Sequence, residues 1–225
     1  MVQKYRNIFD IFPDYQARIG VLGSASGYIM RNPKAISATR EIGEEIAKSG
    51  SILVNGACPG LPDEAALGAK EAGGRTFGIS PAISVTAHLQ KYKSPIQHYD
   101  SFLFTGLGLM MRDIVNIRSS DAVIFLPGGT GTLNEFTVAY DEGKPIGVLT
   151  GHDGCADHIE EILGFCHRKV TKRMVLSDDP KYLVKKLIKI MKQTASGIAI
   201  DDYLLGDSGV VTNIERNIKR DEGQK

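Results

Sequence analysis

The chain of 225 residues carries 27 Lys and Arg against 26 Asp and Glu, and 42% of its residues are hydrophobic. These proportions are those of a globular domain and exclude a disordered chain. The near-neutral charge argues against a nucleic-acid-binding protein, in which Lys and Arg cluster. The length favours one α/β domain over two, and no apolar run reaches the roughly 18 residues that a membrane span needs.

Short apolar runs alternate with stretches of helical periodicity along most of the chain. Strands are predicted at 17–24, 51–55, 75–80, 101–105, 121–126, 145–149 and 173–176. Helices are predicted at 33–48, 61–72, 107–119, 133–142, 157–167 and 180–193. Such alternation implies right-handed crossovers and a mostly parallel sheet with helices on both faces. The predicted fold class is therefore α/β, a doubly wound Rossmann-like domain, in which the nearly continuous apolar run DAVIFL at 121–126 is a strand buried on both faces.

The predicted domain organisation has three parts. We expect an N-terminal extension at 1–16, a single Rossmann-like nucleotide-binding domain at 17–195 and a C-terminal tail at 196–225. Within the domain, the stretch 81–100 is polar and irregular, and it is long for a structureless loop. We expect it to be either a lid over a ligand or a partly ordered segment.

The cysteine and histidine patterns favour neither disulfides nor metal. Cys58, Cys155 and Cys166 are odd in number and form no CxxC pair, so a disulfide framework and a zinc knuckle are both disfavoured. No HxxxH or HExxH pair occurs, so we expect no metal site. The start of the chain also lacks the apolar core of a signal peptide. We therefore expect a protein of the reduced cytoplasm, with Cys58 packed as a small residue in its turn.

Three of the predicted strand-to-helix turns, at 23–27, 56–60 and 128–132, are rich in glycine, serine and threonine. In a parallel sheet such turns meet at the carboxyl edge, where glycine lets a ligand approach the backbone and helix N-termini attract anions. Neither a GxGxxG nor a GxxxxGK[ST] motif is present, which favours a phosphomonoester over a dinucleotide or a nucleoside triphosphate. The predicted phosphate-binding residues are Gly23, Ser24, Gly56, Gly60, Gly128, Gly129, Thr130, Gly131 and Thr132.

The segment 111–135, MRDIVNIRSSDAVIFLPGGTGTLNE, closely resembles the signature of the lonely-guy family. The family pattern PGGxGTxxE is matched by Pro127, Gly128, Gly129, Gly131, Thr132 and Glu135, and Arg112 stands where the family has an arginine. A weaker resemblance extends from 17 to about 193. It implies a cytokinin riboside 5′-monophosphate phosphoribohydrolase that acts on an AMP-like nucleotide without a cofactor, as a homodimer or higher homo-oligomer. The family's other label, lysine decarboxylase, needs a Schiff-base lysine, which the motif lacks.

Three departures from the family pattern point to a second possibility. Asp113 replaces the lysine that commonly follows the family arginine, Asn116 replaces a methionine, and the second turn lacks a three-glycine run. These changes resemble a sister branch that includes proteins similar to molybdenum-cofactor carriers. The alternative to the hydrolase is therefore a non-catalytic protein that binds or carries a nucleotide or a pterin-type cofactor. The third possibility is a scaffold protein with a vestigial pocket.

The resemblance assigns catalytic roles to Glu135 and Arg112. Cleavage of an N-glycosidic bond passes through an oxocarbenium-like state, which a carboxylate stabilises while a cation complements the departing group or the phosphate. Simpler interpretations also exist: Thr132 to Glu135 is a capping-box pattern, and Arg112 could be a surface residue paired with Asp113 or Glu135. We expect Asp121, at the start of its strand, to be structural. Asn55 is either a ligand contact or an ordinary turn residue.

Overall fold

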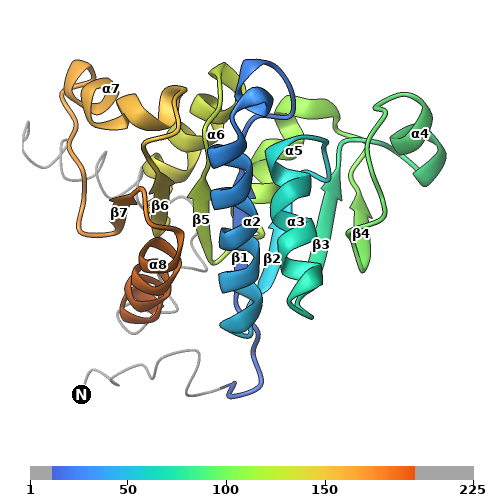
Figure 1. The fold of residues 1–225 in the computed structure, drawn as a ribbon, viewed down its shortest axis with the longest axis horizontal. Helices are drawn as coiled ribbons and strands as arrows, with labels where there is room; N and C mark the ends of the chain where they lie inside the picture. Colours follow the sequence, from blue (N-terminus) through green and yellow to red (C-terminus); the bar gives the residue numbers. More distant parts are fainter. Residues whose placement is uncertain (1–11, 196–225) are drawn as a thin grey trace, which may run out of the picture. The chain divides into compact units, whose positions relative to one another are not determined.

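A parallel sheet of seven strands, in the order β4-β3-β2-β1-β5-β6-β7, runs through the part of the chain described by the computed structural model, residues 12–195 (Figure 1). All six pairs of neighbouring strands are parallel. The strands are β1 Arg18–Leu22, β2 Ile52–Asn55, β3 Arg75–Ser80, β4 Ser101–Phe104, β5 Ala122–Phe125, β6 Ile146–Leu149 and β7 Met174–Ser177. Residues 15–191 form one unit that contains the whole sheet.

Helices cover both faces of this sheet, as the doubly wound prediction requires. The α-helices are α2 Pro33–Lys48, α3 Leu61–Glu71, α4 Val85–Gln90, α5 Gly108–Arg118, α6 Thr130–Asp141, α7 Ile159–Phe165 and α8 Pro180–Ala195, with 3₁₀ turns η1 Tyr28–Arg31 and η2 Cys155–His158. Helices α2, α3 and α8 lie on one face, and α5 and α6 lie on the other (Figure 1). The predicted α/β fold is confirmed.

Strand β5 contributes side chains to the packing on both faces of the sheet. All four of its residues are buried, and successive side chains point to opposite faces. Ile124 lies near Gly147 of β6 on the face covered by α8, whose Leu183 and Leu187 also approach Gly147. Phe125 packs edge-to-face against Phe136 of α6, with ring centroids 5.4 Å apart.

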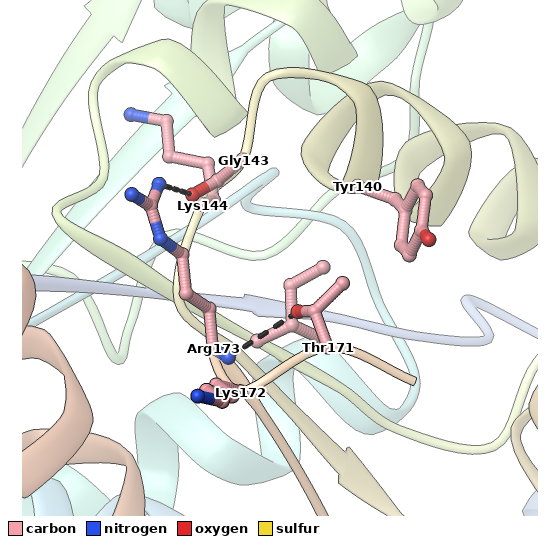
Figure 2. Close-up of a pocket in the computed structure, with 7 residues that line it drawn as sticks. Tyr140, Gly143, Lys144, Thr171, Lys172 and Arg173 are labelled. Carbon is pink, nitrogen blue, oxygen red and sulfur yellow. Dashed lines mark hydrogen bonds between the residues drawn. The ribbon is translucent and has the colours of Figure 1, made fainter. Parts of the chain in front are cut away.

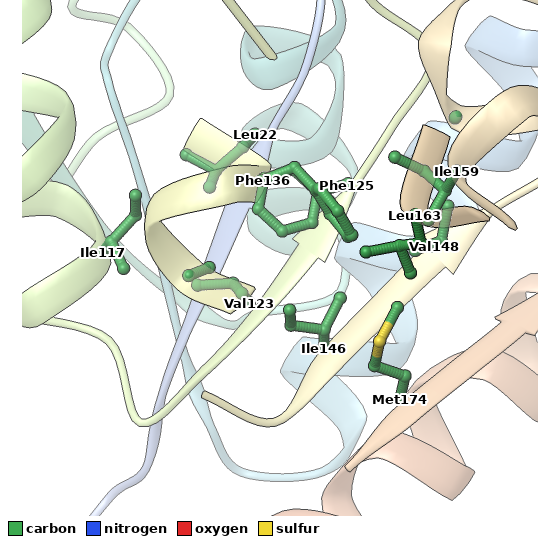
Figure 3. Packing of buried hydrophobic residues seen from close by; sticks show 12 residues of the cluster. Leu22, Ile117, Val123, Phe125, Phe136, Ile146, Val148, Ile159, Leu163 and Met174 are labelled. Carbon is green, nitrogen blue, oxygen red and sulfur yellow. The ribbon is translucent and has the colours of Figure 1, made fainter. Parts of the chain in front are cut away.

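The core beneath α5, α6 and α7 joins side chains from four neighbouring strands, β1, β5, β6 and β7, to those helices (Figure 3). It contains Leu22, Ile117, Val123, Phe125, Phe136, Ala139, Ile146, Val148, Ala156, Ile159, Leu163 and Met174. Each large apolar side chain buried in this way stabilises the fold by about 1.5–3 kcal/mol. This core fixes α6 against β5, and thereby fixes the turn that connects them.

Two segments differ from the sequence-based prediction. Helix α6 begins at Thr130, three residues before the predicted start at 133, so half of the third glycine turn is helical. The stretch 81–100 contains α4, which begins where the Ser84 side chain accepts a hydrogen bond from the Ala87 amide at 3.2 Å. A serine cap produces no apolar periodicity, so the pattern did not reveal this helix.

Buried polar contacts hold the segment 81–100 against the sheet. His88 is fully buried, with Nδ1 2.8 Å from the Ser80 hydroxyl and Nε2 3.0 Å from the Pro95 carbonyl oxygen. His98 contacts the Asp63 carboxylate of α3 at 2.9 Å. The segment is therefore partly ordered, which is one of the two expectations for it. Its action as a lid stays a prediction.

Strand order reverses between β1 and β5, which lie side by side in the centre of the sheet. Crossover connections leave these two strands toward opposite faces, so a crevice is expected beyond their carboxyl ends. The three glycine turns follow β1, β2 and β5, and so all emerge at this edge.

The outer parts of the predicted domain organisation stay predictions, because 1–11 and 196–225 lie outside the described residues. Within 12–195, no helix is both long and apolar enough to cross a membrane.

Candidate functional site

The three glycine turns meet through their backbones. The Ser24 amide, after β1, donates to the Pro127 carbonyl oxygen at 3.0 Å, and the Leu61 amide donates to the Ser24 carbonyl oxygen at 2.9 Å. The turn after β1 therefore lies between the turns that follow β5 and β2. The structure brings the predicted residues Gly23, Ser24, Gly60 and Gly128 into one neighbourhood, as the parallel sheet implied.

The turn after β5 is the open one. Gly129, Thr130 and Gly131 are exposed, and a Cβ atom added at Gly129 or Gly131 would meet no atom within 4 Å. These residues form the start of α6, whose first amides have no acceptor within the helix and whose dipole favours an anion. The turn thus offers several N–H donors to a phosphate-sized group.

The inner side of this open turn is braced by the loop after β6. The Cys155 amide donates to the Gly128 carbonyl oxygen at 2.8 Å, and Gly154 packs so closely that a Cβ there would lie 2.7 Å from the same oxygen. Thr132 is 4% exposed and packs against Gly128. The open amides are therefore presented on a fixed backbone.

Three glycines of the turns after β1 and β2, Gly23, Gly56 and Gly60, are packed against protein atoms. A Cβ at Gly60 would lie 2.5 Å from the Ser24 carbonyl oxygen, and one at Gly56 would lie 1.6 Å from Nη1 of Arg112. A Cβ at Gly23 would lie 2.7 Å from that of Leu126. In these turns the absent side chain makes room for the protein itself. Phosphate contacts from these turns stay a prediction.

Arg112 is 6% exposed and extends from α5 across Gly56. Its Nη2 atom lies 3.5 Å from Oδ1 of Asp113, while its buried Nε atom has no hydrogen-bond partner. The interpretation of Arg112 as a surface residue is wrong, but the pairing with Asp113 that came with it is confirmed. The buried guanidinium therefore keeps one N–H donor without a partner, and it lies against Gly56 in the turn after β2.

Glu135 completes the cluster from α6. It is 7% exposed, and its carboxyl group makes a hydrogen-bonding contact with that of Asp113, which is 6% exposed. Burial, and then the Asp113 charge, raise the pKa of Glu135 to about 8, although Arg112 opposes the rise. Burial also raises the pKa of Asp113, against the opposing charge of Arg112. The three side chains form a buried Arg–Asp–Glu cluster.

The capping-box interpretation of Glu135 is wrong. The residue before α6 is Gly129, and no side chain caps the helix. Because α6 begins at Thr130, Thr132 is already the third helical residue and Glu135 lies nearly a turn further along. Its carboxyl group contacts Asp113 of α5 instead of the backbone at the helix start.

The turn after β2 also places a thiol beside the cluster. Ala57 has a positive φ of 48°, and its amide donates to Oδ1 of the fully buried Asn55 at 2.8 Å. Asn55 is thus an ordinary turn residue, as one of its two interpretations held. The next residue, Cys58, is half-buried, and burial raises its pKa to about 11, so the thiol is uncharged at neutral pH. The charge of Arg112 lowers this pKa and that of Glu135 raises it, so the thiol lies in the electrostatic environment of the cluster.

Sequence reasoning missed Asp113 as a member of the site and treated Cys58 as packing alone. The signal for Asp113 was present as a departure from the family pattern, but its contact with Glu135 depends on the packing of α5 against α6.

Asp121 is structural, as expected. Its carboxylate accepts hydrogen bonds from the Tyr15 hydroxyl at 2.7 Å and the Arg18 amide at 2.8 Å, at the amino end of β5.

A cavity of about 360 Å³ lies at the opposite edge of the sheet, before β6 and β7 (Figure 2). Two of the three cations that line it hold loops: Arg173 donates to the Gly143 carbonyl oxygen and Lys144 to that of Ser120, each at 2.8 Å. Parallel sheets bind ligands at their carboxyl edge, so this cavity is separate from the candidate site. Among residues 12–195 no three His, Cys, Asp or Glu side chains are grouped to hold a metal ion.

A doubly wound parallel sheet, with an open helix N-terminus and a buried Arg–Asp–Glu cluster on the helices that follow β4 and β5, defines a Rossmann-like protein. The profile of the SLOG cluster4 family matches residues 16–184. The chain belongs to this family, and the resemblance to the lonely-guy group and its molybdenum-cofactor carrier branch is confirmed.

The proteins similar to this chain include a phosphoribohydrolase and molybdenum-cofactor proteins. A cytokinin riboside 5′-monophosphate phosphoribohydrolase of Mycobacterium tuberculosis is 29% identical over 182 residues, covering 73% of this chain and 94% of the relative. The structure of a molybdenum cofactor binding protein from Rippkaea orientalis is 26% identical, with a TM-score of 0.63, and 79% of this chain covers 98% of it. The molybdenum cofactor carrier protein of Chlamydomonas reinhardtii is 28% identical, with a TM-score of 0.61 and coverage of 79% and 99%. The relatives thus include both activities that the sequence left open.

Proposed function

We propose that the protein binds a nucleoside 5′-monophosphate at the carboxyl edge of its sheet and hydrolyses the N-glycosidic bond to a free base and ribose 5-phosphate. The observation that carries this proposal is the position of Glu135 on the helix whose start forms the open turn. Glu135 lies four positions after Gly131, a rise of about 6 Å along the helix axis, which suits a ribose between a bound phosphate and the carboxyl group.

The open turn and the cluster divide the chemistry between them. Backbone amides at 129–132 bind the phosphate, and Thr130 adds a hydroxyl donor. Glu135 meets the anomeric carbon and the departing base, where charge develops in an oxocarbenium-like transition state. Arg112 supplies positive charge to the same region from α5. The relative from Mycobacterium tuberculosis supports this assignment, since its name describes this reaction.

The proposal is tested by incubating the protein with AMP and with its N6-isopentenyl analogue and measuring free base and ribose 5-phosphate. Glu135→Gln is expected to lower the rate at least about 100-fold, the lower range for loss of a general acid or base. Asp141→Asn is the matched control, because Asp141 is an exposed acid at the far end of the same helix. A Glu135→Gln variant that is folded and works at the wild-type rate would contradict the proposal.

A second candidate is a carrier of a nucleotide or pterin-type cofactor in the same site. It is favoured by Asp113, which takes the place of a family lysine and pairs with Arg112, and by the two molybdenum-cofactor relatives. This candidate predicts a bound phosphate-bearing ligand in native mass spectrometry of the purified protein, together with no turnover of either nucleotide. Release of base at a rate that depends on Glu135 would exclude it.

We also propose that the protein works as a homodimer or higher homo-oligomer, as its family resemblance implies, and that the simplest form is a dimer. Four large apolar side chains just before Arg112 are exposed, one directly before α5 and three in its first turn: Leu107, Leu109, Met110 and Met111 are 49%, 56%, 59% and 55% exposed. Contiguous apolar surface of this kind is typical of an interface. Sedimentation should show a dimer that Met110→Glu dissociates. A monomeric wild type at high concentration would contradict this.

A further inference from the structure

Asp113 has no part in the hydrolysis proposed above, yet it lies in the cluster between Arg112 and Glu135. Its carboxyl group contacts the guanidinium of Arg112 on one side, at 3.5 Å, and the carboxyl group of Glu135 on the other. All three side chains are less than one tenth exposed. A residue placed only to pair with Arg112 would not need to touch a second acid.

Two buried carboxyl groups in contact do not both stay ionised, because like charges at hydrogen-bonding distance repel strongly where water does not screen them. A hydrogen bond between two carboxyl groups also needs a proton, since an ionised carboxylate can only accept. Arg112 balances one negative charge. The cluster is therefore neutral when it contains one guanidinium, one carboxylate and one carboxylic acid.

Geometry decides which acid carries the proton. Asp113 is the carboxyl group in contact with Arg112, and an adjacent cation favours the ionised form. Glu135 is buried on α6, makes a hydrogen-bonding contact with Asp113, and is affected more strongly by the Asp113 charge than by that of Arg112. The charge thus belongs on Asp113 and the proton on Glu135. The pKa of about 8 at Glu135, raised by burial and by Asp113, agrees with this.

We propose that Asp113 is a positioning residue that keeps one proton on Glu135 near neutral pH, and that Glu135 gives this proton to the departing base. The second half of this inference rests on the proposed function. The bond between the anomeric carbon and the base nitrogen breaks, its electron pair goes to that nitrogen, and the nitrogen takes the Glu135 proton. Water then adds to the anomeric carbon and returns a proton to the carboxyl pair, which restores the starting state.

The surroundings of the pair contain no other charge that would remove this proton. Two thiols influence Glu135: Cys58, from the turn after β2, and Cys155, from the start of η2. Burial raises the pKa of each, so both are uncharged at neutral pH. Among the described residues whose charge acts on Glu135, Arg112 is the cation and Asp113 is the anion, and Asp113 has the larger effect.

Infrared spectroscopy of the free protein tests the proton directly and needs no substrate. A band from a protonated carboxyl group is expected near neutral pH, absent from Glu135→Gln and unchanged in the control Asp141→Asn. In Asp113→Asn the midpoint at which this band disappears on raising the pH should fall by at least about one pH unit, since an opposing charge worth that shift is removed. No such band in the wild type, or an unchanged midpoint in Asp113→Asn, would overturn the proposal.

The pH profile of nucleotide cleavage tests the use of the proton. The alkaline limb of kcat/KM reports an acid that must stay protonated, and Asp113→Asn should move this limb to lower pH by the same amount as the infrared midpoint. A limb that stays in place in a folded variant would show that the proton is not used. If the wild type cleaves no nucleotide while the infrared results hold, the hydrolase proposal fails and the proton pair stands. If Asp113→Asn does not fold, the wild type and Glu135→Gln still decide whether Glu135 carries the proton.

Discussion

The turns after β2 and β5 look alike in the sequence, and the structure gives them opposite surroundings. Each begins with glycine at the end of a buried strand and leads into a helix. In the turn after β2, the space beside Gly56 is occupied by the Arg112 guanidinium. In the turn after β5, Gly129 and Gly131 face no protein atom within 4 Å of where a Cβ atom would stand. One turn makes room for the protein's own cation, and the other leaves room for a ligand.

This difference shows that a glycine-rich turn at a carboxyl edge is not by itself a phosphate site. The missing side chain lets some group approach the backbone closely, and the packing of distant elements decides whether that group is part of the protein. Here α5, which follows β4, brings Arg112 over the turn after β2. Adding a single methyl group at chosen glycines distinguishes the filled turns from the open one.

The largest effect on stability is expected at Gly60. Its φ of +84° strains any other residue, and a Cβ would lie 2.5 Å from the Ser24 carbonyl oxygen, which cannot move freely. Strain and overpacking together give a loss of about 2–4 kcal/mol in the free energy of unfolding for Gly60→Ala. Gly27→Ala is the matched control, with a φ of +95° but no atom within 4 Å, and should lose only about 1–2 kcal/mol. Equal losses in urea unfolding would show that the contact with Ser24 has no energetic role.

A smaller loss of stability, with a large loss of function, is expected for Gly56→Ala. The added Cβ overlaps the end of a flexible side chain, so Arg112 can move, and the cost should be about 1–2 kcal/mol. The displaced guanidinium no longer faces Asp113 and the site. Nucleotide cleavage should therefore fall at least about tenfold, equivalent to ~1.4 kcal/mol in the barrier. Wild-type turnover in this variant would show that the position of Arg112 is unimportant.

The fold could be predicted from the sequence because its signals are local. The DAVIFL run, the helical periodicities and the glycine turns each report a strand, a helix or a connection, and the right-handed crossover rule assembles them. The same rule predicts that the three glycine turns lie together at the carboxyl edge of the sheet. Helix α4 escaped prediction because a serine cap and His88, rather than an apolar stripe, hold it in place.

The site could be predicted only in part, because its contacts join residues that lie far apart in the sequence. Arg112 and Glu135 were assigned from the family resemblance, whereas the contact of Asp113 with Glu135 depends on how α5 packs against α6. The burial of Arg112 over Gly56 depends on the same packing. Sequence spacing along one helix carries no information about a neighbour that is 22 positions away, so the proton pair became visible only in three dimensions.

At the open turn, Gly131→Ala should leave the fold intact and weaken ligand binding. No atom lies within 4 Å of the added Cβ, and alanine is favoured over glycine in a helix, so the free energy of unfolding should change by less than ~1 kcal/mol, toward greater stability. The Cβ tilts toward the helix N-terminus, into the space that a phosphate would use. Calorimetry should show about tenfold weaker binding of a nucleoside monophosphate, a difference of ~1.4 kcal/mol. Unchanged affinity would place the phosphate elsewhere.

A pH dependence of stability is also expected from Glu135, on the helix that begins at the open turn. Because the pKa of Glu135 is raised from 4.5 to about 8, the folded state holds more protons than the unfolded state between these values. The stability that this group contributes is complete below about pH 4.5 and is lost as the pH rises through 8. Glutamine mimics the protonated acid, so the free energy of unfolding of Glu135→Gln should fall less between pH 5 and 8 than that of the wild type, by more than the ~0.5 kcal/mol of a surface substitution. Asp141→Asn should follow the wild-type curve, and a parallel curve for Glu135→Gln would show that Glu135 is ionised throughout this range.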